Sequence, residues 1–521
     1  MSDKIFSGSR RGLLSVWGFN IDEGKEMQSN LKNKVILSLI WKLLERGGTQ
    51  GIQFILQIIL ARLLLPKDFG LIVLVTIFIT VANVFVQSGL NTALIQKKNT
   101  NDLDYSSVFY FNIIVACILY FIIYLCAPLI ANYFSEPELV TILRALSITL
   151  IIGAFQSIQN AIIAIRMLFK LLLQSSLFSI VISGTLGIAM AYLGFGVWSL
   201  VIQQITNTFL VTLILFLTLK WRPKLIFSLE RLRELFKNGW KILGASLAEA
   251  IYTNLRSLII SKMFTADILG FYNRGKQFPA IVVTNINGSI LDVMLPTFSS
   301  QQDNIQKVKE ILRRSIASSS FIVFPMMIGM AVIAEPLTYL LLTEKWLPAV
   351  PFLQIYCLIF ALWPYQTAHM QAVIAIGRGD IYLAREVITK IIGLVILGIT
   401  LFYGVNGIVI GEFLSSILAT ILFSSPNIKL LNYSYKEQFK DIIPSLAISL
   451  LMGLVAFSIK WMGLSMLHTL IIQLAVGIVV YFGLAMIFKI EVYRYLINTV
   501  KQMINKGKIT STENIIFKKN I

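Results

Sequence analysis

Apolar residues run along the chain in long stretches that are separated by short polar breaks. Each stretch has about 20 residues or more, the length that an α-helix needs to cross the apolar core of a bilayer. The breaks contain turn-forming residues such as Pro66, Gly194 and Gly404. The pattern therefore predicts an all-α, polytopic membrane protein with about fourteen transmembrane helices. Their approximate ranges are 35–63, 69–95, 106–130, 139–165, 172–194, 196–219, 239–262, 268–297, 314–335, 349–376, 381–403, 405–425, 441–462 and 467–488.

The amino-acid composition leads to the same class of protein. Of the 521 residues, 56% are hydrophobic and only 14% are charged, whereas ordinary soluble domains contain about 25% charged residues. These values exclude a soluble globular protein, a disordered chain and a coiled coil. The cysteines Cys117, Cys126 and Cys357 all lie in apolar stretches, which argues against a disulfide framework. The two histidines form no cluster with cysteine, so no metal site is predicted.

The chain is strongly basic, with 45 Lys and Arg against 26 Asp and Glu and a formal net charge of +19. In a membrane protein such an excess belongs to cytoplasmic loops and anionic lipid rather than to a nucleic-acid site. The basic residues concentrate in every second loop when the N-terminus is placed inside. An even number of helices preserves this alternation. We therefore expect both termini in the cytoplasm and a location in the cytoplasmic membrane.

A weak internal repeat relates the first predicted helix to the seventh. Trp41 and Trp240 stand at the start of these helices, and Gly70 and Gly270 stand at the start of the helices that follow. An even number of helices separates the two copies, so both have the same orientation in the membrane. This arrangement predicts two parallel six-helix lobes. Chance matching between apolar sequences is the alternative.

The predicted domain boundaries follow from this repeat. They are an N-terminal cytoplasmic arm at 1–33, a first lobe at 34–219, a basic cytoplasmic linker at 220–238, a second lobe at 239–425, two additional transmembrane helices within 441–488 and a basic cytoplasmic tail at 489–521. The arm is polar, and Met27 opens a segment typical of the start of such a protein. We hypothesise that translation starts at Met27. Detection of a peptide from residues 1–24 in the native host would refute this start.

Polar residues follow one face of the first predicted helix. They are Lys42, Glu45, Arg46, Thr49, Gln50 and Gln53. Steps of three and four residues place them on one side of the helix, and charges within a membrane span usually face a cavity or a partner. We interpret this face as the lining of a solvent-filled cavity, with Lys42, Arg46, Gln50 and Gln53 as substrate-binding candidates. The alternative is an internal ion pair of Glu45 with Lys42 or Arg46 that serves stability alone.

The seventh and eighth predicted helices carry a similar set of polar residues. Glu249 and Arg256 lie two turns apart on the seventh helix, and Arg274 and Asp292 lie on the eighth. Arg256 and Arg274 join the substrate-binding candidates. A buried carboxylate can also bind a coupling proton or cation. The candidates for this role are Glu45, Glu249 and Asp292, with Glu386 and Glu412 as further carboxylates of the same kind.

Motifs of the common enzyme classes are missing from the sequence. It contains no G-x-x-x-x-G-K-[ST] phosphate-binding loop, no nucleophile elbow and no metalloprotease motif. The predicted outer loops are short, which leaves little room for the site of a membrane glycosyltransferase or a polysaccharide polymerase. The sequence therefore favours a transporter over an enzyme. No cofactor is predicted beyond a coupling proton or sodium ion.

Five segments resemble one known family of membrane proteins. They are Trp41–Gly51, Ile59–Gly70, Gly89–Gln96, Phe271–Pro279 and Leu341–Trp346. They are similar to the polysaccharide transporter family of Wzx-type flippases, within the multidrug/oligosaccharidyl-lipid/polysaccharide exporter superfamily. The stretch from Ala61 to Gly70 is the most specific of the five. The resemblance implies a V-shaped bundle of two lobes that translocates an undecaprenyl-diphosphate-linked oligosaccharide by alternating access. Membrane lipids, a polysaccharide polymerase and assembly proteins are the partners that it implies.

The predicted charges suit an anionic substrate of this kind. A diphosphate that crosses a region of low dielectric constant needs cations, and the planar fork of arginine can bind two of its oxygens. A multidrug exporter of the same superfamily is one alternative, although a cationic cavity would repel cationic drugs. A membrane scaffold of a polysaccharide assembly complex, without transport activity, is the other alternative. Loss of activity without loss of abundance on charge reversal at Arg46 would favour the flippase over the scaffold.

Overall fold

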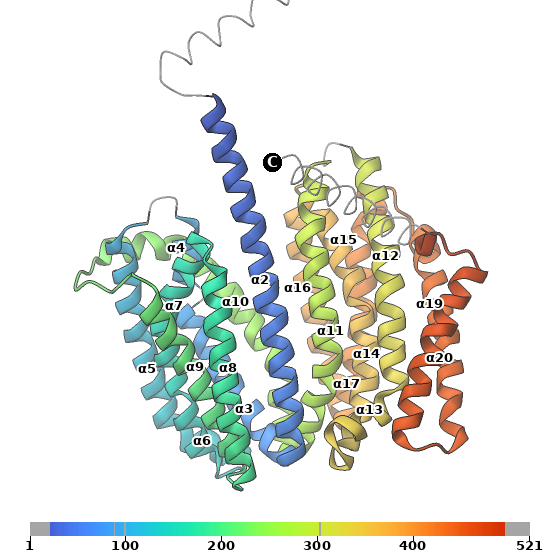
Figure 1. Cartoon of the computed structure of the whole chain (residues 1–521), viewed down its shortest axis with the longest axis horizontal. Helices are drawn as coiled ribbons and strands as arrows, with labels where there is room; N and C mark the ends of the chain where they lie inside the picture. Colours follow the sequence, from blue (N-terminus) through green and yellow to red (C-terminus); the bar gives the residue numbers. More distant parts are fainter. Residues whose placement is uncertain (1–20, 88, 98–99, 302–303, 495–521) are drawn as a thin grey trace, which may run out of the picture. The chain divides into compact units, whose positions relative to one another are not determined.

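The structure is a computed structural model that describes residues 21–87, 89–97, 100–301 and 304–494. Side chains of residues 21–40, 43, 238, 289–290, 292–293 and 295–296 lie outside the described part. Within these ranges every regular element is helical (Figure 1). The prediction of an all-α protein is therefore confirmed. The chain forms two compact units.

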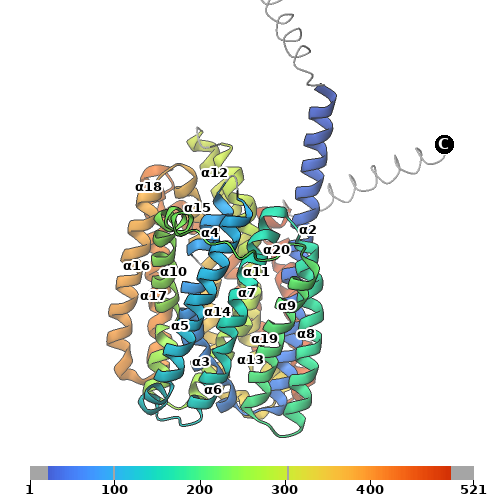
Figure 2. The ribbon, with the colours of Figure 1, turned by 90° about the vertical axis from the view of Figure 1, so that its left-hand side faces the viewer.

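The first unit comprises the chain up to Leu63 together with Val75–Ile251. Its helices are α2 (Ile21–Leu63), α4 (Gly89–Gln96), α5 (Asp102–Phe134), α6 (Leu139–Leu146), α7 (Ile148–Arg166), α8 (Phe169–Tyr192), α9 (Val197–Thr218) and the larger parts of α3 (Pro66–Gln87) and α10 (Leu229–Met263), whose remaining residues belong to the second unit. α2 packs along α8, α8 along α9, and both α5 and α9 along α7. Figure 2 shows α5, α7, α9 and α8 side by side with nearly parallel axes.

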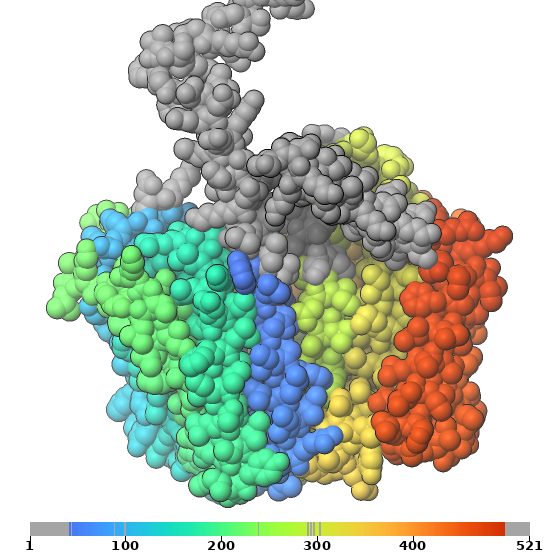
Figure 3. Space-filling model, in the orientation of Figure 1, coloured from blue at the N-terminus to red at the C-terminus, as the bar shows by residue number. Residues whose placement is uncertain are grey.

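The second unit comprises Leu64–Leu74 and the chain from Tyr252 onward. Its helices are α11 (Ala266–Ser299), α12 (Ile305–Val332), α13 (Ala334–Leu342), η1 (Glu344–Ala349), α14 (Val350–Ala361), α15 (Trp363–Ala375), α16 (Gly379–Thr400), η2 (Leu401–Tyr403), α17 (Gly404–Ser424), α18 (Pro426–Leu430), α19 (Tyr435–Ser458), η3 (Ile459–Met462) and α20 (Met466–Ile487). α11 packs against α14 and α15, and α16 packs against α17. In Figure 3, the orange and red atoms of α19 and α20 form one block beside the yellow atoms of α12 and α13.

Ten helical stretches within the described ranges are long and apolar enough to cross a membrane. One of these, Gly379–Leu430, contains both α16 and α17. α2, α10 and α11 are not among them, and these helices carry most of the charged positions that the sequence singles out. Large apolar side chains such as Phe121, Leu125 and Leu129 of α5 are exposed on the protein surface, as expected where lipid rather than water surrounds a helix. The chain is thus a multi-pass membrane protein, and the total of about fourteen spans stays a prediction.

Two of the predicted helices are each divided into two. The stretch 139–165 forms α6 and α7, which are separated at Ser147, whose hydroxyl donates to the carbonyl of Leu143. Such bonding back to the preceding turn bends helices. The stretch 349–376 forms α14 and α15, with Pro364 in the first turn of α15. Proline fits there because the first turn needs no backbone N–H donor.

The unit boundaries differ from the predicted domain boundaries, because the division falls within α10 and not in the linker 220–238. The predicted arm at 1–33 overlaps α2, which begins at Ile21. Residues 1–20 and most of the tail, from 495 onward, lie outside the described residues. The lobe and linker boundaries and the start at Met27 stay predictions.

α12 and α19 are joined by two ion pairs. Lys309 Nζ lies 2.9 Å from Glu437 Oε1, and Arg313 donates to both carboxylate oxygens of Asp441 at 2.7 Å. Each pair is one helical turn from the other on both helices, so the two pairs share one register. These ion pairs hold α19, and with it α20, against α12 within the second unit.

Candidate functional site

A carboxylate lies at the meeting point of helices in the second unit. Glu412 of α17 accepts a hydrogen bond of 2.7 Å from the hydroxyl of Tyr356, and the hydroxyl of Tyr272 lies 3.4 Å from the same oxygen. The two phenol oxygens are 2.6 Å apart. Both tyrosines are fully or nearly fully buried. Since two phenols from α14 and α11 converge on one carboxylate oxygen, the side chain of Glu412 has a defined position.

Arg256 of α10 faces this carboxylate. Its Nε lies 3.6 Å from Glu412 Oε2, an ion-pair distance that is too long for a hydrogen bond. The guanidinium carbon lies 5.8 Å from the ring centre of Tyr252. Arg256 is only 7% exposed, and its Nε has no hydrogen-bond partner among the residues that the structure describes. Buried donors are almost always paired. An unpaired Nε at this depth therefore indicates that Arg256 can donate to an acceptor from outside the protein.

Further cations surround the pair. Lys276 Nζ of α11 lies 5.4 Å from the ring centre of Tyr356. Lys390 Nζ of α16 lies 5.6 Å from the ring centre of Tyr252 and 3.3 Å from Glu386 Oε1. With Arg256, these side chains place three cations near two carboxylates. The cluster therefore carries an excess of positive charge in a region of the protein that the bilayer is expected to surround.

Arg274 lies elsewhere in the second unit, packed between aromatic rings. Its guanidinium carbon is 4.4 Å from the ring centre of Phe69 and 5.2 Å from that of Trp346, and it donates to Gln277 Oε1 at 2.7 Å. The residue is only 5% exposed. Three of the segments quoted above, those containing Phe69, Arg274 and Trp346, thus meet at one place. The geometry gives Arg274 the contacts of a packing residue.

Residues at matching positions of the predicted repeat make a reciprocal contact between α3 and α11, within the second unit. A Cβ atom added to Gly70 would lie 1.8 Å from the carbonyl oxygen of Ala266, and one added to Gly270 would lie 2.2 Å from the carbonyl oxygen of Pro66. Pro66 and Ala266 have the same spacing in sequence as Gly70 and Gly270. Equivalent residues therefore contact one another across a local two-fold arrangement, and this favours a true repeat over chance matching.

The candidates on α2 belong to the first unit. Lys42 and Arg46 are exposed, whereas Glu45, Gln50 and Gln53 are half-buried. Lys42 Nζ lies 5.6 Å from the ring centre of Phe169. The Oε1 atom of Gln50 is buried and has no hydrogen-bond partner among the described residues. α2 thus presents cations on its surface, with a polar side chain below them that retains an unused acceptor.

Two further predicted carboxylates, Glu249 and Asp292, lie on α10 and α11. Glu249 lies on the part of α10 that belongs to the first unit, and its side chain is exposed. Asp292 lies on α11, and its side chain is outside the described part of the chain. Of the predicted binding residues, the structure therefore brings Arg256 together with a carboxylate of the second unit.

Uncharged polar residues fill part of the interior of the first unit. Asn112 donates to Ser157 at 2.8 Å and to Asn91 at 3.4 Å. Amides at such positions join neighbouring helices in membrane proteins. The pairing of Asn112 with Ser157 and Asn91 shows that amides inside this unit serve packing.

Sequence reasoning did not single out Tyr272 and Tyr356. Tyrosine in membrane helices is common near the lipid–water interfaces, where its hydroxyl meets water. Both residues lie within predicted spans, and a tyrosine that is buried there needs a partner for its hydroxyl within the protein. The identity of that partner, Glu412, cannot be read from the sequence because it lies on a different helix, far along the chain.

Residues 59–351 match the sequence profile of a family described as "Polysaccharide biosynthesis protein". The chain belongs to this family. The predicted resemblance is therefore confirmed.

Characterised proteins that are similar to this chain are named for related processes. The chain is 25% identical over 313 residues to the succinoglycan biosynthesis transport protein ExoT of Rhizobium meliloti, an alignment that covers 60% of this chain and 63% of ExoT. It is 22% identical over 438 residues to the lipopolysaccharide biosynthesis protein WzxC of Escherichia coli, covering 82% of this chain and 89% of WzxC. The chain thus spans slightly less than two thirds of the length of ExoT and most of WzxC.

Solved structures share the fold. The lipid II flippase MurJ in its inward closed conformation superposes with a TM-score of 0.71 at 18% identity, covering 89% of this chain and all of MurJ (100%). An inward-facing multidrug resistance MATE family transporter of the MOP superfamily superposes with a TM-score of 0.54 at 16% identity, covering 76% of this chain and 96% of that protein. The family member described here therefore has the fold of MurJ and the MATE transporters.

Proposed function

We propose that this chain is a flippase, which translocates an undecaprenyl-diphosphate-linked oligosaccharide across the cytoplasmic membrane by alternating access. Family membership and the names of the relatives support a transport role in polysaccharide biosynthesis. The observation that carries the proposal is the buried Arg256, whose Nε donor has no hydrogen-bond partner among the described residues. The diphosphate of the substrate would supply the acceptor.

The geometry around Arg256 allows it to exchange partners. Its Nε forms an ion pair with Glu412 at 3.6 Å but no hydrogen bond. The guanidinium can therefore turn to a phosphate oxygen without breaking a hydrogen bond between Nε and Glu412. The fork of an arginine can then bind two oxygens at once. Lys276 and Lys390 add positive charge from α11 and α16. In the first unit, Lys42 and Arg46 would attract the diphosphate, Gln50 would accept a hydrogen bond from a sugar hydroxyl through its Oε1 atom, and Gln53 would donate to one. Arg274 would stabilise the second unit.

The first test of this proposal is the pool of lipid-linked glycan in a deletion strain. Loss of the protein should cause undecaprenyl-diphosphate glycan to accumulate on the inner leaflet, and the wild-type gene should restore export. The glycan can be measured by lipid extraction and by its accessibility to a glycosidase added outside spheroplasts. An unchanged pool with altered sensitivity to cationic drugs would favour a multidrug exporter. If neither the glycan pool nor the sensitivity to cationic drugs changed, the result would favour a membrane scaffold without transport activity.

We also propose that Glu412 couples transport to a proton. When Arg256 turns to the diphosphate, the buried carboxylate loses its ion-pair partner, and a proton is the smallest cation that can replace it. The phenols of Tyr272 and Tyr356 hold the carboxyl group in place during this exchange. When the substrate leaves, Arg256 returns and the proton is released.

The Glu412→Gln variant tests this coupling. The amide keeps an oxygen acceptor for both tyrosines but cannot exchange a proton, so transport in proteoliposomes should become insensitive to an imposed pH gradient. The wild type should respond to the gradient by about tenfold or more, as expected for a coupled step of 1.4 kcal/mol or more. Normal folding of the variant is verified by size-exclusion chromatography. A pH response equal to that of wild type would refute the role of Glu412.

We further propose that both termini lie in the cytoplasm and that the chain has no catalytic activity of its own. The alternation of basic loops supports this orientation. A polysaccharide polymerase and other assembly proteins would act on the translocated glycan. Labelling of single cysteines with a membrane-impermeant reagent, in intact and in opened cells, tests the orientation of both ends.

A further inference from the structure

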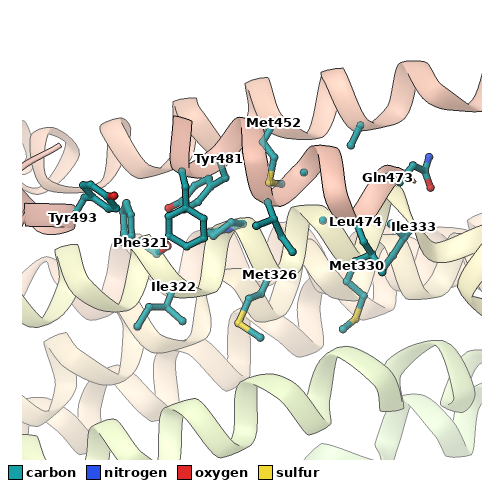
Figure 4. A pocket seen from close by; sticks show the side chains of 16 residues that line it. Phe321, Ile322, Met326, Met330, Ile333, Met452, Gln473, Leu474, Tyr481 and Tyr493 are labelled. Carbon is teal, nitrogen blue, oxygen red and sulfur yellow. The ribbon is translucent and has the colours of Figure 1, made fainter. Parts of the chain in front are cut away.

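An apolar groove of about 840 Å³ lies between α12, α19 and α20 of the second unit (Figure 4). Phe321 and Met326 of α12, Met452 of α19, and Leu474 and Tyr481 of α20 are among the residues that line it. Figure 4 shows Tyr493 and Phe321 near one end, and Ile333 and Gln473 near the other. Methionine side chains are flexible and adapt to irregular apolar ligands. The groove is therefore suited to a flexible hydrocarbon chain.

The groove has a polar continuation. The residues that line a second hollow of about 360 Å³ include Glu310, Arg313, Arg314, Asp441, Glu491 and Val492. The residues of α12 that line the two hollows follow one another in steps of three and four, which places them on one face of that helix. Val492 lines the polar hollow, and its neighbour Tyr493 lines the apolar groove. Together the two hollows match the outline of an amphiphile with a polar head.

The length of the apolar part indicates the type of chain. From Phe321 to Ile333 the groove follows α12 for about 18 Å at 1.5 Å per residue. This is close to half of the hydrocarbon core of a bilayer, which is about 30 Å thick. The acyl chains of one leaflet therefore fit the groove, whereas a long isoprenoid chain would extend well beyond its end.

The charges of the polar hollow indicate the head group. Arg313 is neutralised by Asp441, to which it makes two hydrogen bonds. Arg314, Glu310 and Glu491 are exposed, and no ion pair of these three side chains is seen among the described residues. One cation and two carboxylates thus remain for a ligand. A diphosphate would meet net negative charge there, whereas a phosphate joined to an ammonium group would match both signs.

We propose that this groove binds one zwitterionic aminophospholipid molecule, with the phosphate at Arg314, the ammonium group at Glu310 and Glu491, and the acyl chains along α12 and α20. The site is separate from the cluster at Arg256, and its occupancy does not depend on the proposed transport function. The proposal assigns a role to α19 and α20, which correspond to the two additional helices predicted from the sequence: together with α12 they hold a structural lipid.

Native mass spectrometry of the full chain in a mild detergent tests the proposal. After removal of endogenous lipid, phosphatidylethanolamine should rebind as a single molecule. Phosphatidylglycerol and undecaprenyl phosphate should each bind at least about tenfold more weakly than phosphatidylethanolamine, because neither carries an ammonium group for the carboxylates. Arg314→Ala and Glu491→Gln should each weaken phosphatidylethanolamine binding by a similar factor, while Lys241→Ala, in the first unit, should not.

A pair of glycine substitutions on α20 separates binding in the groove from unspecific adhesion of lipid. Gly477 lines the groove, and the nearest side-chain atoms to an added Cβ are those of Met452 at 3.9 Å. Gly483 has no atom within 4 Å of such a Cβ. Gly477→Leu should fill the groove and abolish binding, while Gly483→Leu should leave it unchanged. Equal binding by both variants, or a preference for undecaprenyl phosphate, would overturn the proposal. Elution as a monodisperse species establishes that each variant is folded.

Discussion

Export of lipid-linked glycan is expected to stop when Arg256 and Glu412 are both replaced by glutamine. Removing one member of a buried ion pair leaves an uncompensated charge and costs several kcal/mol of stability, whereas removing both members is often neutral. The double variant should therefore fold and reach the membrane in normal amount. Without the guanidinium, the diphosphate would lose its charge-assisted hydrogen bonds in the second unit. At about 1.5–3 kcal/mol for each such bond, two lost bonds correspond to a decrease in binding of about 100-fold or more.

The Arg256→Lys variant is the matched comparison for this experiment. Lysine preserves the positive charge and the ion pair with Glu412 but lacks the planar fork that binds two phosphate oxygens. We expect a transport rate between those of the wild type and the double variant. Both variants are measured in the deletion strain by the amount of accumulated undecaprenyl-diphosphate glycan, with protein abundance determined in the same membranes. Wild-type export by the double variant would exclude Arg256 from substrate binding.

Substitution of Gly70 by alanine is expected to have the largest effect on stability. The added Cβ would lie 1.8 Å from the carbonyl oxygen of Ala266, far inside van der Waals contact. A backbone oxygen cannot move aside as a flexible side chain can, so α3 and α11 would have to separate. Overpacking in a well-packed core costs about 1–3 kcal/mol, occasionally more, and we expect about 3 kcal/mol or more here. The readout is the fraction of protein that remains monodisperse after solubilisation and heating.

Two other glycines provide internal comparisons. Gly270→Ala places a Cβ 2.2 Å from the carbonyl oxygen of Pro66, so the repeat predicts a loss of stability similar to that of Gly70→Ala. Gly51→Ala on α2 meets no atom within 4 Å. Alanine is favoured over glycine in a helix by about 0.5–1 kcal/mol, so this variant should be as stable as the wild type or slightly more stable. Equal stability of all three variants would mean that the reciprocal contact is not important for folding.

Much of the fold could be predicted because the signals are local. The length of an apolar stretch and its polar breaks place helices such as α5, α8 and α9, since the bilayer requires each span to satisfy its own backbone hydrogen bonds. Breaks within a span were harder to predict. The division at Ser147 depends on one hydroxyl bonding back to Leu143, which a sequence pattern of apolar residues does not reveal.

The candidate site was predicted only in part. The position of Arg256 within an apolar span marked it as a functional residue, because an unpaired charge there is costly. The same argument selected Arg274, which the structure packs between Phe69 and Trp346. Burial of a charge thus predicts that a partner exists, but a phosphate, a carboxylate and an aromatic ring can each be that partner.

By itself the sequence determined that this chain is an all-helical membrane protein of the polysaccharide biosynthesis family, with cationic residues in helices that it predicts to cross the membrane. It also contained the matching positions around Gly70 and Gly270. Only the tertiary structure decided that Glu412 receives two tyrosines and faces Arg256, and that α12, α19 and α20 enclose an apolar groove. The physical reason is that helix formation depends on neighbours along the chain, whereas the partners of a buried side chain come from helices that are distant in sequence and adjacent only after packing.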